Sequence, residues 1–503
     1  MTIYNLNMGI GWASSGVEYA QAYRGHIFQK NKQEAKFIFT DIFRENLEPM
    51  TKNLGFKDDE IIWLYQYFTD VKVSPTRFSV TELENSFAES EFNKDKNENL
   101  ITYAFKNTGV RLTAFLDQHA NHKEDVVYKT ELIVDGNLLQ RDYYSYVKTF
   151  SEYFKPVNGS ANLYQRRFFN ADGSIAYDEL LNGEESLYVF ENKTIYSKEK
   201  LIVLFFESLG LTKNDIILID RSTGMGPQVI QAKGEAKVGV VVHAEHFNEP
   251  MTNEEHILWN NYYDYQFENA DSIDFFVTAT KIQKEILEEQ FAKYGKGSIN
   301  VYAIPVGSID RLQTKKKRKP HSLVTASRLA SEKHLDWMVY AVAKAHASIN
   351  DLSLDIYGQG GEEGMLRSLI SELGAEDYIQ LKGHHDLTKI YKNYSAYIST
   401  STSEGFGLTL LEAVGSGLPM IGFNVRYGNQ TFIENDQNGY LIEYHNHDKV
   451  KDIENISLAI NKLMESDKKL IEASQRSYEI AEPFLTKHIQ EQWIELEKEV
   501  TDA

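Results

Sequence analysis

The stretch STSEGFGLTLLEAVGSGLPMIGFN, from Ser401 to Asn424, contains the features that decide the fold. A strand ends in small residues, a helix is predicted to begin at Gly405–Leu408, and PMIGFN forms the next strand. This order is typical of an α/β sheet that binds its ligand at the carboxyl ends of parallel strands. The start of a helix offers unpaired N–H groups to an anionic or hydroxyl-rich ligand. Glu404 and Glu412, at the loop and two turns along the helix, are therefore expected to face one ligand at different depths.

Working outward, the same rhythm of strand and helix continues on both sides of this stretch. From His321 onward, LVTASRL, LSLDIYG, YIQLKG and AYISTS are predicted strands, and WMVYAVAKAHASI and MLRSLISELG are predicted helices. We expect residues 320–484 to form one Rossmann-like domain. The final segment, 485–503, is amphipathic and is predicted to form a helix that packs back on the N-terminal domain.

The N-terminal part of the chain predicts a second domain of the same kind. IYNLN, the loop GIGWASSG, a helix and KFIFT give a βαβ unit, and buried strands return after residue 200 with DIILID, KVGVVVHAEH, SIDFFVTAT and SINVYAIPVG. Residues 1–70 and 200–314 are therefore expected to form this domain. The basic run KKKRK at 315–319 is interpreted as a solvated linker between the two domains rather than a nucleic-acid or targeting patch.

Residues 71–199 are predicted to be an inserted antiparallel β-meander. Alternation of apolar and polar residues replaces helical periodicity, and Asp-Gly and Asn-Gly pairs occur between the alternating runs. Tyrosine and phenylalanine are dense here, as in RDYYSYVKTFSEYF. Two interpretations stay open, an ordinary sheet surface and a docking sheet for a partner protein.

Composition limits the classes of function. The chain has 503 residues, which corresponds to several domains, and its formal net charge is −20, which argues against binding nucleic acid. It contains no cysteine, so disulfides, thiolate metal sites and a cysteine nucleophile are excluded. Neither a secretory signal nor a membrane-spanning apolar run is visible. We expect a soluble, cytoplasmic protein with at most peripheral association at the inner face of the membrane.

Three spaced elements resemble a known family. Glu404 and Glu412, within EGFGLTLLEA, resemble the Glu-x7-Glu signature of retaining glycosyltransferases of family 4, and the likeness continues through GSGLPMIGFNVRYG and QNGYLI. SRLASEKHLD resembles the Arg-Leu-x-x-Glu-Lys loop of that family and supplies Arg328, Glu332 and Lys333. The resemblance implies the GT-B architecture, in which two Rossmann-like domains face a cleft, and a transfer that retains the anomeric configuration.

The resemblance also implies roles for individual residues. Arg328 and Lys333 would stabilise the leaving diphosphate, a role that suits a guanidinium fork and an ammonium point charge. Glu404 would hold sugar hydroxyls and Glu412 the ribose, and Glu332 belongs to the same loop. The remaining substrate-binding residues that it implies are Ser15, Gly16, Val17, Glu18, Tyr19, His243, His384, His385, Gly405, Phe406 and Gly407. No Asp-x-Asp pair is present in the chain, so neither a metal nor another cofactor is expected.

Together with the insert, the likeness is to the catalytic subunits of accessory-secretion O-N-acetylglucosaminyltransferases of Gram-positive bacteria. This resemblance implies transfer of N-acetylglucosamine from UDP-N-acetylglucosamine to serine and threonine of a serine-rich repeat adhesin before its export. It also implies a catalytically degenerate paralogue as co-activator, bound through residues 71–199. Two alternatives remain: a wall-teichoic-acid N-acetylglucosaminyltransferase, which has a similar insert, and a non-catalytic co-activator paralogue. Retention of Arg328, Lys333, Glu404 and Glu412 argues against the second.

Overall fold

The computed structural model describes eight stretches of the chain, which are residues 1–12, 16–87, 90–119, 124–221, 223–295, 297–314, 317–445 and 448–502. The chain divides into two compact units. The first contains Met1–Val240 and Asp271–Asp274, and the second contains Val241–Ala270 and Phe275–Ala503. One residue predicted to bind substrate, Ser15, lies outside the described residues.

The first unit contains a parallel α/β sheet in the strand order β15-β14-β1-β2-β3. The strands are β1 (Thr2–Asn7), β2 (Glu34–Phe39), β3 (Ile61–Trp63), β14 (Ile216–Ile219) and β15 (Lys237–Val242). The accompanying helices are α1 (Gly16–Asn31), α2 (Leu47–Asn53), α3 (Leu64–Tyr67), α5 (Lys198–Ser208) and α6 (Gly226–Ala232). Every residue of β14 is buried, which explains its continuous apolar sequence. The predicted N-terminal unit of strand, loop, helix and strand is confirmed.

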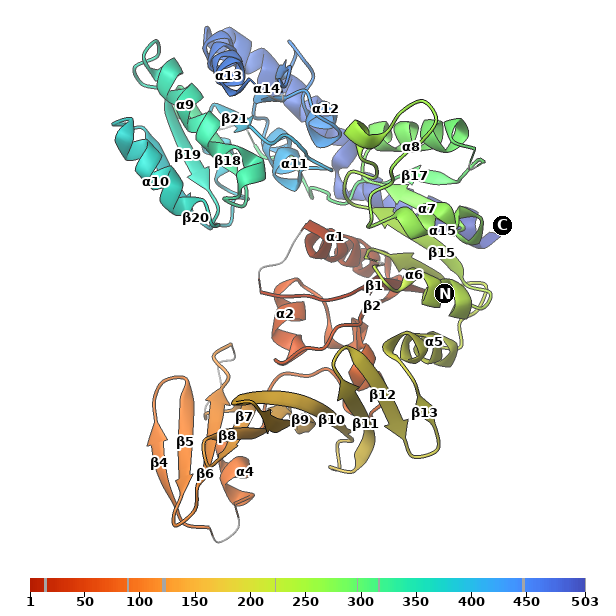
Figure 1. Ribbon diagram of the computed structural model, residues 1–503. Coiled ribbons are helices and arrows are strands. Elements are labelled where there is room, and N and C mark those ends of the chain that lie inside the picture. The colour runs from red at the N-terminus through yellow and green to blue at the C-terminus, as the bar shows by residue number, and fades with distance from the viewer. Residues whose placement is uncertain are drawn as a thin grey trace. The chain divides into compact units, whose positions relative to one another are not determined.

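The inserted segment forms a ten-stranded sheet whose strands follow one another in chain order, drawn from orange to olive in Figure 1. Its strands are β4 (Phe92–Lys96), β5 (Leu100–Phe105), β6 (Val110–Leu116), β7 (Val127–Val134), β8 (Asn137–Tyr144), β9 (Lys148–Val157), β10 (Ser160–Phe169), β11 (Ile175–Asn182), β12 (Glu185–Phe190) and β13 (Thr194–Ile195). The turn between β7 and β8 has Asp135 and Gly136 at φ 47° and 80°, as a two-residue hairpin turn requires. The predicted antiparallel meander is confirmed.

Two details differ from the sequence prediction. The segment that follows Val71 does not alternate at once, because Ser79 caps a short helix, α4 (Val80–Asn85), with Glu82 completing the capping box. The chain also forms β3 and α3 at residues 61–67, where no strand was predicted. A strand of three residues is too short to show the alternation of apolar and polar residues that identifies a strand.

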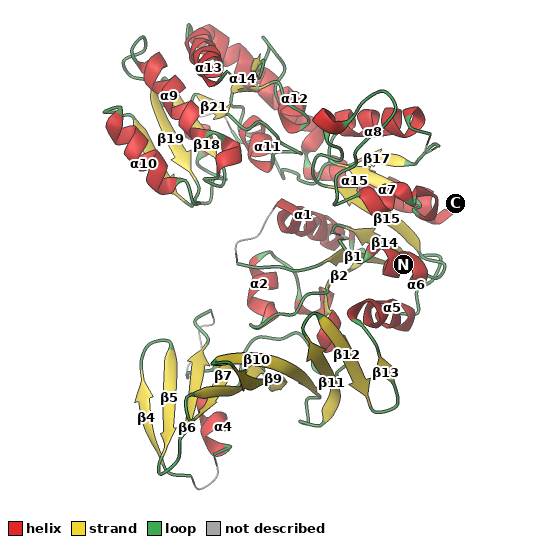
Figure 2. Cartoon of the chain, viewed as in Figure 1, coloured by secondary structure: helices red, strands yellow, loops and turns green. Residues whose placement is uncertain are grey.

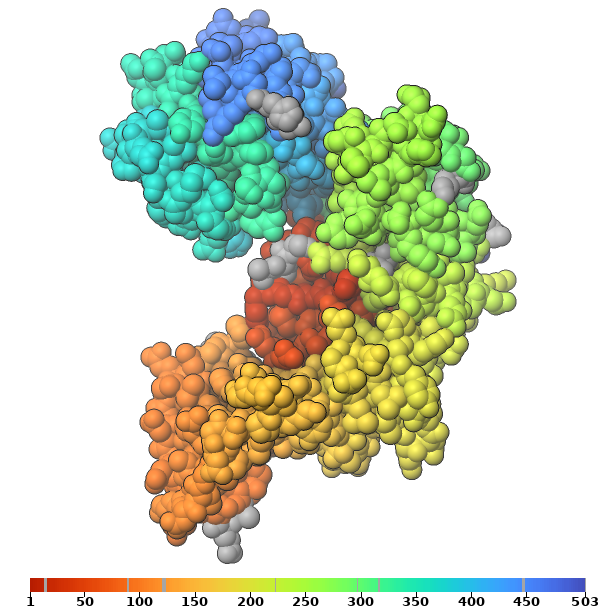
Figure 3. Space-filling model, in the orientation of Figure 1, coloured from red at the N-terminus to blue at the C-terminus, as the bar shows by residue number. Residues whose placement is uncertain are grey.

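The sheet packs on the parallel part of the first unit through aromatic rings and buried charges. Tyr143, Phe150, Phe168 and Tyr177 form a stacked row with ring centroids 4.3, 5.3 and 4.5 Å apart. The ring of Tyr65, from α3, stacks on Phe168 at 5.7 Å. Figure 3 shows the red N-terminal segment and the yellow part of the sheet in contact. Many aromatic residues of the inserted sheet are therefore buried where the sheet packs on the rest of the first unit, and they do not all lie on its surface.

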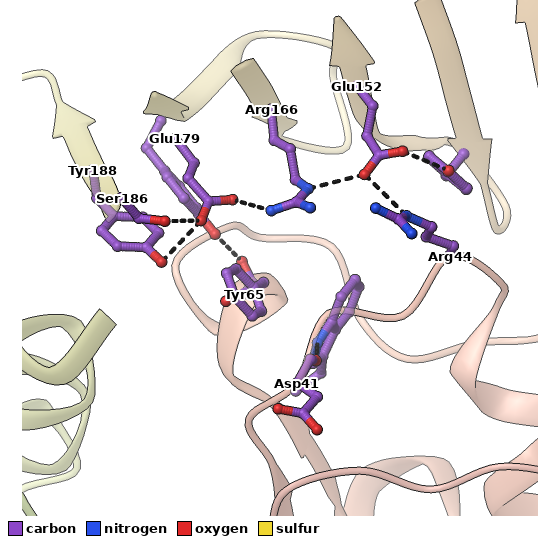
Figure 4. Close-up of polar contacts among 11 residues, drawn as sticks. Asp41, Arg44, Tyr65, Glu152, Arg166, Glu179, Ser186 and Tyr188 are labelled. Carbon is purple, nitrogen blue, oxygen red and sulfur yellow. Dashed lines mark hydrogen bonds and ion pairs between the residues drawn. The ribbon is translucent and has the colours of Figure 1, made fainter. Parts of the chain in front are cut away.

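A buried ion network lies in the same junction. Arg166 donates to Glu152 at 3.0 Å and to Glu179 at 2.8 Å, and Figure 4 shows its guanidinium between the two carboxylates. Arg44, which follows β2, reaches Glu152 at 3.2 Å. The hydroxyl of Tyr188 donates to Glu179. Because these carboxylates are buried, each needs such partners to offset its lost hydration.

The second unit contains a parallel six-stranded sheet in the order β20-β19-β18-β21-β22-β23. Its strands are β18 (Ser322–Ala326), β19 (Ser353–Tyr357), β20 (Ile379–Gly383), β21 (Ala396–Ser399), β22 (Met420–Phe423) and β23 (Gly439–Ile442). The helices α9 (Leu335–His346), α10 (Glu363–Glu372) and α13 (Lys449–Leu463) share one apolar core with the sheet (Figure 2). The helices α11 (Leu408–Gly415), α12 (Gly428–Phe432) and α14 (Asp467–Ala481) contribute to a second core.

The same unit also includes α7 (Asp264–Glu268), β16 (Phe275–Thr278), α8 (Lys281–Lys293), β17 (Val301–Ala303) and α15 (Thr486–Asp502). β16 and β17 are parallel. The terminal helix α15 lies beside β17, because Glu499 of α15 forms a hydrogen bond with Tyr302 of β17. Burial and this hydrogen bond raise the pKa of Tyr302 to about 12. Its first residue, Thr486, donates its backbone N–H to Ile309 at 2.9 Å.

Candidate functional site

An ion pair lies at the carboxyl ends of the strands in the second unit. Lys333 Nζ is 2.8 Å from Glu404 Oε2, and their side chains are only 18% and 21% exposed. Lys333 follows β18, and Glu404 follows β21, which pairs directly with β18. The fold therefore brings together two predicted site residues that are 71 positions apart. An ammonium and a carboxylate held in this way can meet a phosphate and a sugar hydroxyl.

Neighbouring hydrogen bonds hold both loops in place. The hydroxyl of Thr400 donates to the carbonyls of Lys333 at 2.8 Å and His334 at 3.1 Å. The carbonyl of Glu404 accepts from the N–H groups of Tyr427 and Gly428, each at 2.8 Å. The pair is therefore fixed by the ends of three neighbouring strands of one sheet.

Gly405 permits a close approach of another predicted site residue. A side chain at this position would place its Cβ 2.6 Å from the carbonyl oxygen of His243. Only a glycine lets the His243 loop lie against the Glu404 loop at this distance. Tyr263 holds the other side of that loop, because its hydroxyl accepts from the N–H groups of His243 and Ala244, each at 2.9 Å.

Arg328 and Lys333 form ion pairs with different carboxylates. Its guanidinium is 2.7 Å from Glu332, and its side chain is 73% exposed. A backbone hydrogen bond and Arg328 lower the pKa of Glu332, although partial burial opposes them. Arg328 thus presents its charge to solvent, whereas Lys333 is largely enclosed.

Two glycines in GQGG, which the sequence analysis did not include in the site, determine where Arg328 lies. A Cβ on Gly358 would be 1.9 Å from the carbonyl oxygen of Ser327, and one on Gly360 would be 2.2 Å from that of Leu329. Leu329 N–H also donates to the carbonyl of Gln359 at 2.9 Å. This glycine turn therefore packs directly against the backbone on both sides of Arg328.

Of the residues that follow Glu404, some are buried in the core and others can reach a ligand. The ring of Phe406 is buried against Phe432 at 5.2 Å, so only its backbone is available to a ligand. Gly407 has φ 85° and precedes α11, which begins at Leu408, within the range predicted. Glu412 lies half-buried on the second turn of that helix.

The histidines His384 and His385, which were predicted to bind substrate, are exposed directly after β20. The ring of His385 lies 5.7 Å from that of Tyr357, at the end of the neighbouring strand β19. Both histidines therefore lie beyond the carboxyl end of the same sheet as Lys333 and Glu404.

In the first unit, the described residues predicted to bind substrate, 16–19, lie at the start of α1. Gly16 and Tyr19 are exposed and Val17 is half-buried. Glu18 is buried, and its carboxylate is 3.6 Å from Arg221. The exposed members of this segment can reach a ligand directly, whereas Glu18 is occupied within its own unit.

An arginine and a histidine that sequence reasoning missed support the His243 loop. Arg426 contacts Glu245 at 3.0 Å and Glu249 at 2.6 Å. His246 lies fully buried between the Tyr427 hydroxyl, 3.1 Å from Nδ1, and Gln290 Oε1, 2.8 Å from Nε2. Burial lowers the pKa of His246 to about 4, so the ring is neutral at physiological pH. Only the fold identifies these residues, because single arginines and histidines have no distinctive spacing.

Within the described ranges, no group of three or more His, Cys, Asp or Glu side chains is arranged to hold a metal ion. The described helices likewise include none with both the length and the apolar character needed to cross a bilayer.

Two family models match separate parts of the chain, the inserted sheet and the second unit. Residues 93–192 match the family model "GtfA extended beta-sheet domain", which covers most of the ten-stranded sheet. Residues 308–479 match "Glycosyl transferases group 1", and this region includes Arg328, Lys333, Glu404 and Glu412. The fold and the site thus define a glycosyltransferase of the GT-B architecture with an added β-sheet domain.

Full-length relatives narrow this class. The GtfA subunit of the UDP-N-acetylglucosamine–peptide N-acetylglucosaminyltransferase of Streptococcus gordonii is 50% identical over 507 residues, covering 100% of this chain and 99% of the relative. The chain belongs to the family of these GtfA subunits. By contrast, the poly(ribitol-phosphate) α-N-acetylglucosaminyltransferase of Staphylococcus aureus is 23% identical, covering 93% of this chain and 88% of that enzyme.

Solved structures agree along the entire chain. The pneumococcal O-GlcNAc transferase GtfA in complex with UDP and GlcNAc has a TM-score of 0.93 at 48% identity, covering 100% of this chain and 99% of that one. A chain of the GtfA/B complex has a TM-score of 0.95 at 49% identity, with 100% of both chains covered.

Proposed function

We propose that this protein transfers N-acetylglucosamine from UDP-N-acetylglucosamine to serine and threonine hydroxyls of a serine-rich acceptor protein before its export. The observation that carries the proposal is the enclosed Lys333–Glu404 ion pair, at 2.8 Å, within the region that matches group 1 glycosyltransferases. A non-catalytic paralogue with a degraded site has no need to keep this pair. Membership of the GtfA family supports the choice of donor and acceptor.

In the reaction, the bond between the anomeric carbon and the diphosphate oxygen breaks, and a bond to the acceptor hydroxyl oxygen forms. The hydroxyl proton is released and UDP leaves. We propose that Lys333 and Arg328 stabilise the negative charge that develops on the diphosphate, and that no metal is required. Glu404 would hold sugar hydroxyls and Glu412 the ribose.

The other predicted contacts complete the proposed donor site. The backbone of Gly405, Phe406 and Gly407 would meet the sugar beside His243, while His384 and His385 would meet the base. Glu332 would orient Arg328. From the first unit, the exposed start of α1 at Gly16–Tyr19 would contribute the remaining contacts.

The proposed function is tested by measuring UDP release with the full chain and its partner subunit. A serine-rich peptide, ribitol-phosphate polymer or neither is added with each of several UDP-sugars. We expect release with UDP-N-acetylglucosamine and the peptide, together with a gain in peptide mass of one N-acetylhexosamine. Release that requires the polymer instead would support the teichoic-acid alternative, and absence of release with every acceptor would support a non-catalytic role.

We further propose that the partner is the paralogous GtfB-type subunit and that it docks on the inserted domain, residues 71–199. The crystal structure of the GtfA/B complex supports the existence of such a partner. Leu180 and Val189 are apolar and exposed, at 40% and 37%, on the adjacent strands β11 and β12, near the β13 edge of the sheet. Exposed apolar groups of this kind can anchor an interface.

The docking surface is tested by changing Leu180 and Val189 to aspartate in the full chain. We expect the variant to lose co-purification with the partner subunit while it still binds UDP. Leu458→Asp is the matched control for adding a charge in place of an exposed apolar group, because Leu458 is 59% exposed on α13 of the second unit. Undiminished co-purification of the Leu180 and Val189 variant would place the docking surface elsewhere.

Localisation is also proposed. The donor is a nucleotide sugar, and the acceptor is modified before export, so we propose that the protein acts in the cytoplasm with at most peripheral association with the membrane. Cell fractionation with antibody detection tests this, and recovery in an integral-membrane fraction would contradict it.

A further inference from the structure

A cavity lies in the first unit, where the inserted sheet meets the loops of the parallel sheet. It has a volume of about 390 Å³. Trp12, which follows β1, and Glu45, which follows β2, line it together with Phe115 of β6 and Tyr128 of β7. Asp117 and His119 also line it. The cavity is therefore built by both parts of the unit. It lies beyond the ends of β1 and β2, where α/β sheets bind ligands.

Trp12 is exposed but firmly held. Trp12 is 45% exposed. Its Nε1 donates to Glu45 Oε2 at 3.0 Å, and its ring stacks on that of His119 with the ring centroids 4.0 Å apart. Asp117 holds the histidine loop, because its Oδ1 accepts from the backbone N–H of His119 at 2.8 Å. A large aromatic ring that is fixed in this orientation loses little entropy when a ligand stacks on it.

The charges around the cavity determine which ligand it suits. Its lining includes the carboxylates of Glu45 and Asp117, and no lysine or arginine among the described lining residues. Burial, followed by the charges of Glu45 and Asp117, raises the pKa of Tyr128, so its hydroxyl stays protonated. A diphosphate would be repelled here. A neutral ligand with many hydroxyls and an apolar face can donate to the carboxylates and stack on the rings.

We propose that this cavity binds an N-acetylhexosamine residue that is already attached to the acceptor polypeptide. The inference rests on the proposed function, since that reaction leaves such sugars on a chain with further unmodified serines. The acetamide and the C–H face of the sugar would lie on Trp12, and its hydroxyls would donate to Glu45 and Asp117. Trp12 lies four positions before Gly16, the exposed first residue of α1, so a bound glycan would hold the next serine near the residues of α1 that are proposed to contact the donor.

The test uses the full chain with its partner subunit and four probes. These are a serine-rich peptide, the same peptide with N-acetylglucosamine on some serines, free N-acetylglucosamine and UDP-N-acetylglucosamine. Calorimetric titration measures binding, and UDP release gives KM for both peptides. We expect tighter binding of the glycopeptide than of the bare peptide. In Trp12→Ala and Glu45→Gln, the ratio of KM for glycopeptide to KM for bare peptide should rise about tenfold, the effect of losing roughly 1.4 kcal/mol.

Tyr196→Ala is the matched control, because it removes an aromatic ring that is 78% exposed in the same unit and distant in sequence from the cavity lining. It should leave the ratio unchanged. An unchanged ratio in Trp12→Ala and Glu45→Gln, or an equal loss on both peptides, would overturn the glycan subsite. Loss of UDP-N-acetylglucosamine binding in these variants would instead assign the cavity to the donor. Failure of the proposed function would appear separately, as no UDP release with either peptide in the wild type.

Discussion

Lys333 Nζ lies 2.8 Å from Glu404 Oε2, and each side chain is about four-fifths enclosed. The ammonium is therefore positioned by the same carboxylate that is proposed to hold the sugar. Arg328, by contrast, is exposed and pairs with Glu332. Two cations that are five residues apart thus have different environments, one in an enclosed ion pair and one in an exposed ion pair.

Replacing Lys333 with alanine should lower the rate of transfer by about 10²–10³-fold, because a charge-stabilising group is lost from an enclosed site. Lys333→Arg should keep part of the activity, since it keeps the charge. Lys344→Ala is the control, because Lys344 forms an ion pair with Glu454 on the surface of the same unit. Steady-state UDP release measures all three. Near-normal turnover in Lys333→Ala would contradict the proposed role.

Gly360→Ala should impair both stability and turnover. The added Cβ would meet the carbonyl oxygen of Leu329 at 2.2 Å, so the backbone beside Arg328 must shift. We expect a cost of about 1–3 kcal/mol, typical of overpacking, and a lower kcat. The neighbouring variant Gly361→Ala is the control, because a Cβ there has no other atom within 4 Å. Thermal unfolding and UDP release distinguish the two, and equal behaviour would argue against the steric explanation.

Arg166→Ala should strongly destabilise the junction of the inserted sheet. It would leave the buried carboxylates of Glu152 and Glu179 without their shared cation, at a cost of about 3–5 kcal/mol. Arg167→Ala removes the next arginine, whose contact with Asp178 at 2.8 Å is more exposed, and should cost at most about 1 kcal/mol. Urea unfolding monitored by circular dichroism compares them. Similar midpoints for the two variants would show that the buried network contributes little.

Stability should fall as the pH is lowered from about 6.5 toward 4, partly through His246. The pKa of His246 is about 4 in the folded protein and about 6.5 in the unfolded chain. The contribution of the neutral ring to the free energy of unfolding is therefore complete above pH 6.5. It is lost progressively below that pH, because the unfolded chain binds the proton first. The full contribution is roughly 3 kcal/mol. His246→Gln should reduce the slope of unfolding free energy against pH in this window. His256→Gln, which makes the same substitution at an 80% exposed side chain, is the matched control. A wild-type slope in His246→Gln would contradict this assignment.

Excess chelator should leave transfer intact if cationic side chains alone stabilise the diphosphate. UDP is best measured directly by chromatography, because coupling enzymes can themselves need metal ions. An inactive sample that recovers when Mn²⁺ or Mg²⁺ is added would show that the proposal of a metal-free site is wrong.

The alternation of strands and helices, the antiparallel meander and the place of Glu404 and Glu412 in one motif can all be predicted from the sequence. These follow from local chemistry, since buried parallel strands are continuously apolar and Asp-Gly turns form hairpins. Three contacts appear only in the folded structure: that of Lys333 with Glu404, that of Gly360 with the backbone beside Arg328, and that of Arg166 with two buried carboxylates. Each of these contacts joins segments whose approach depends on strand order and packing, and no local period along the chain records it.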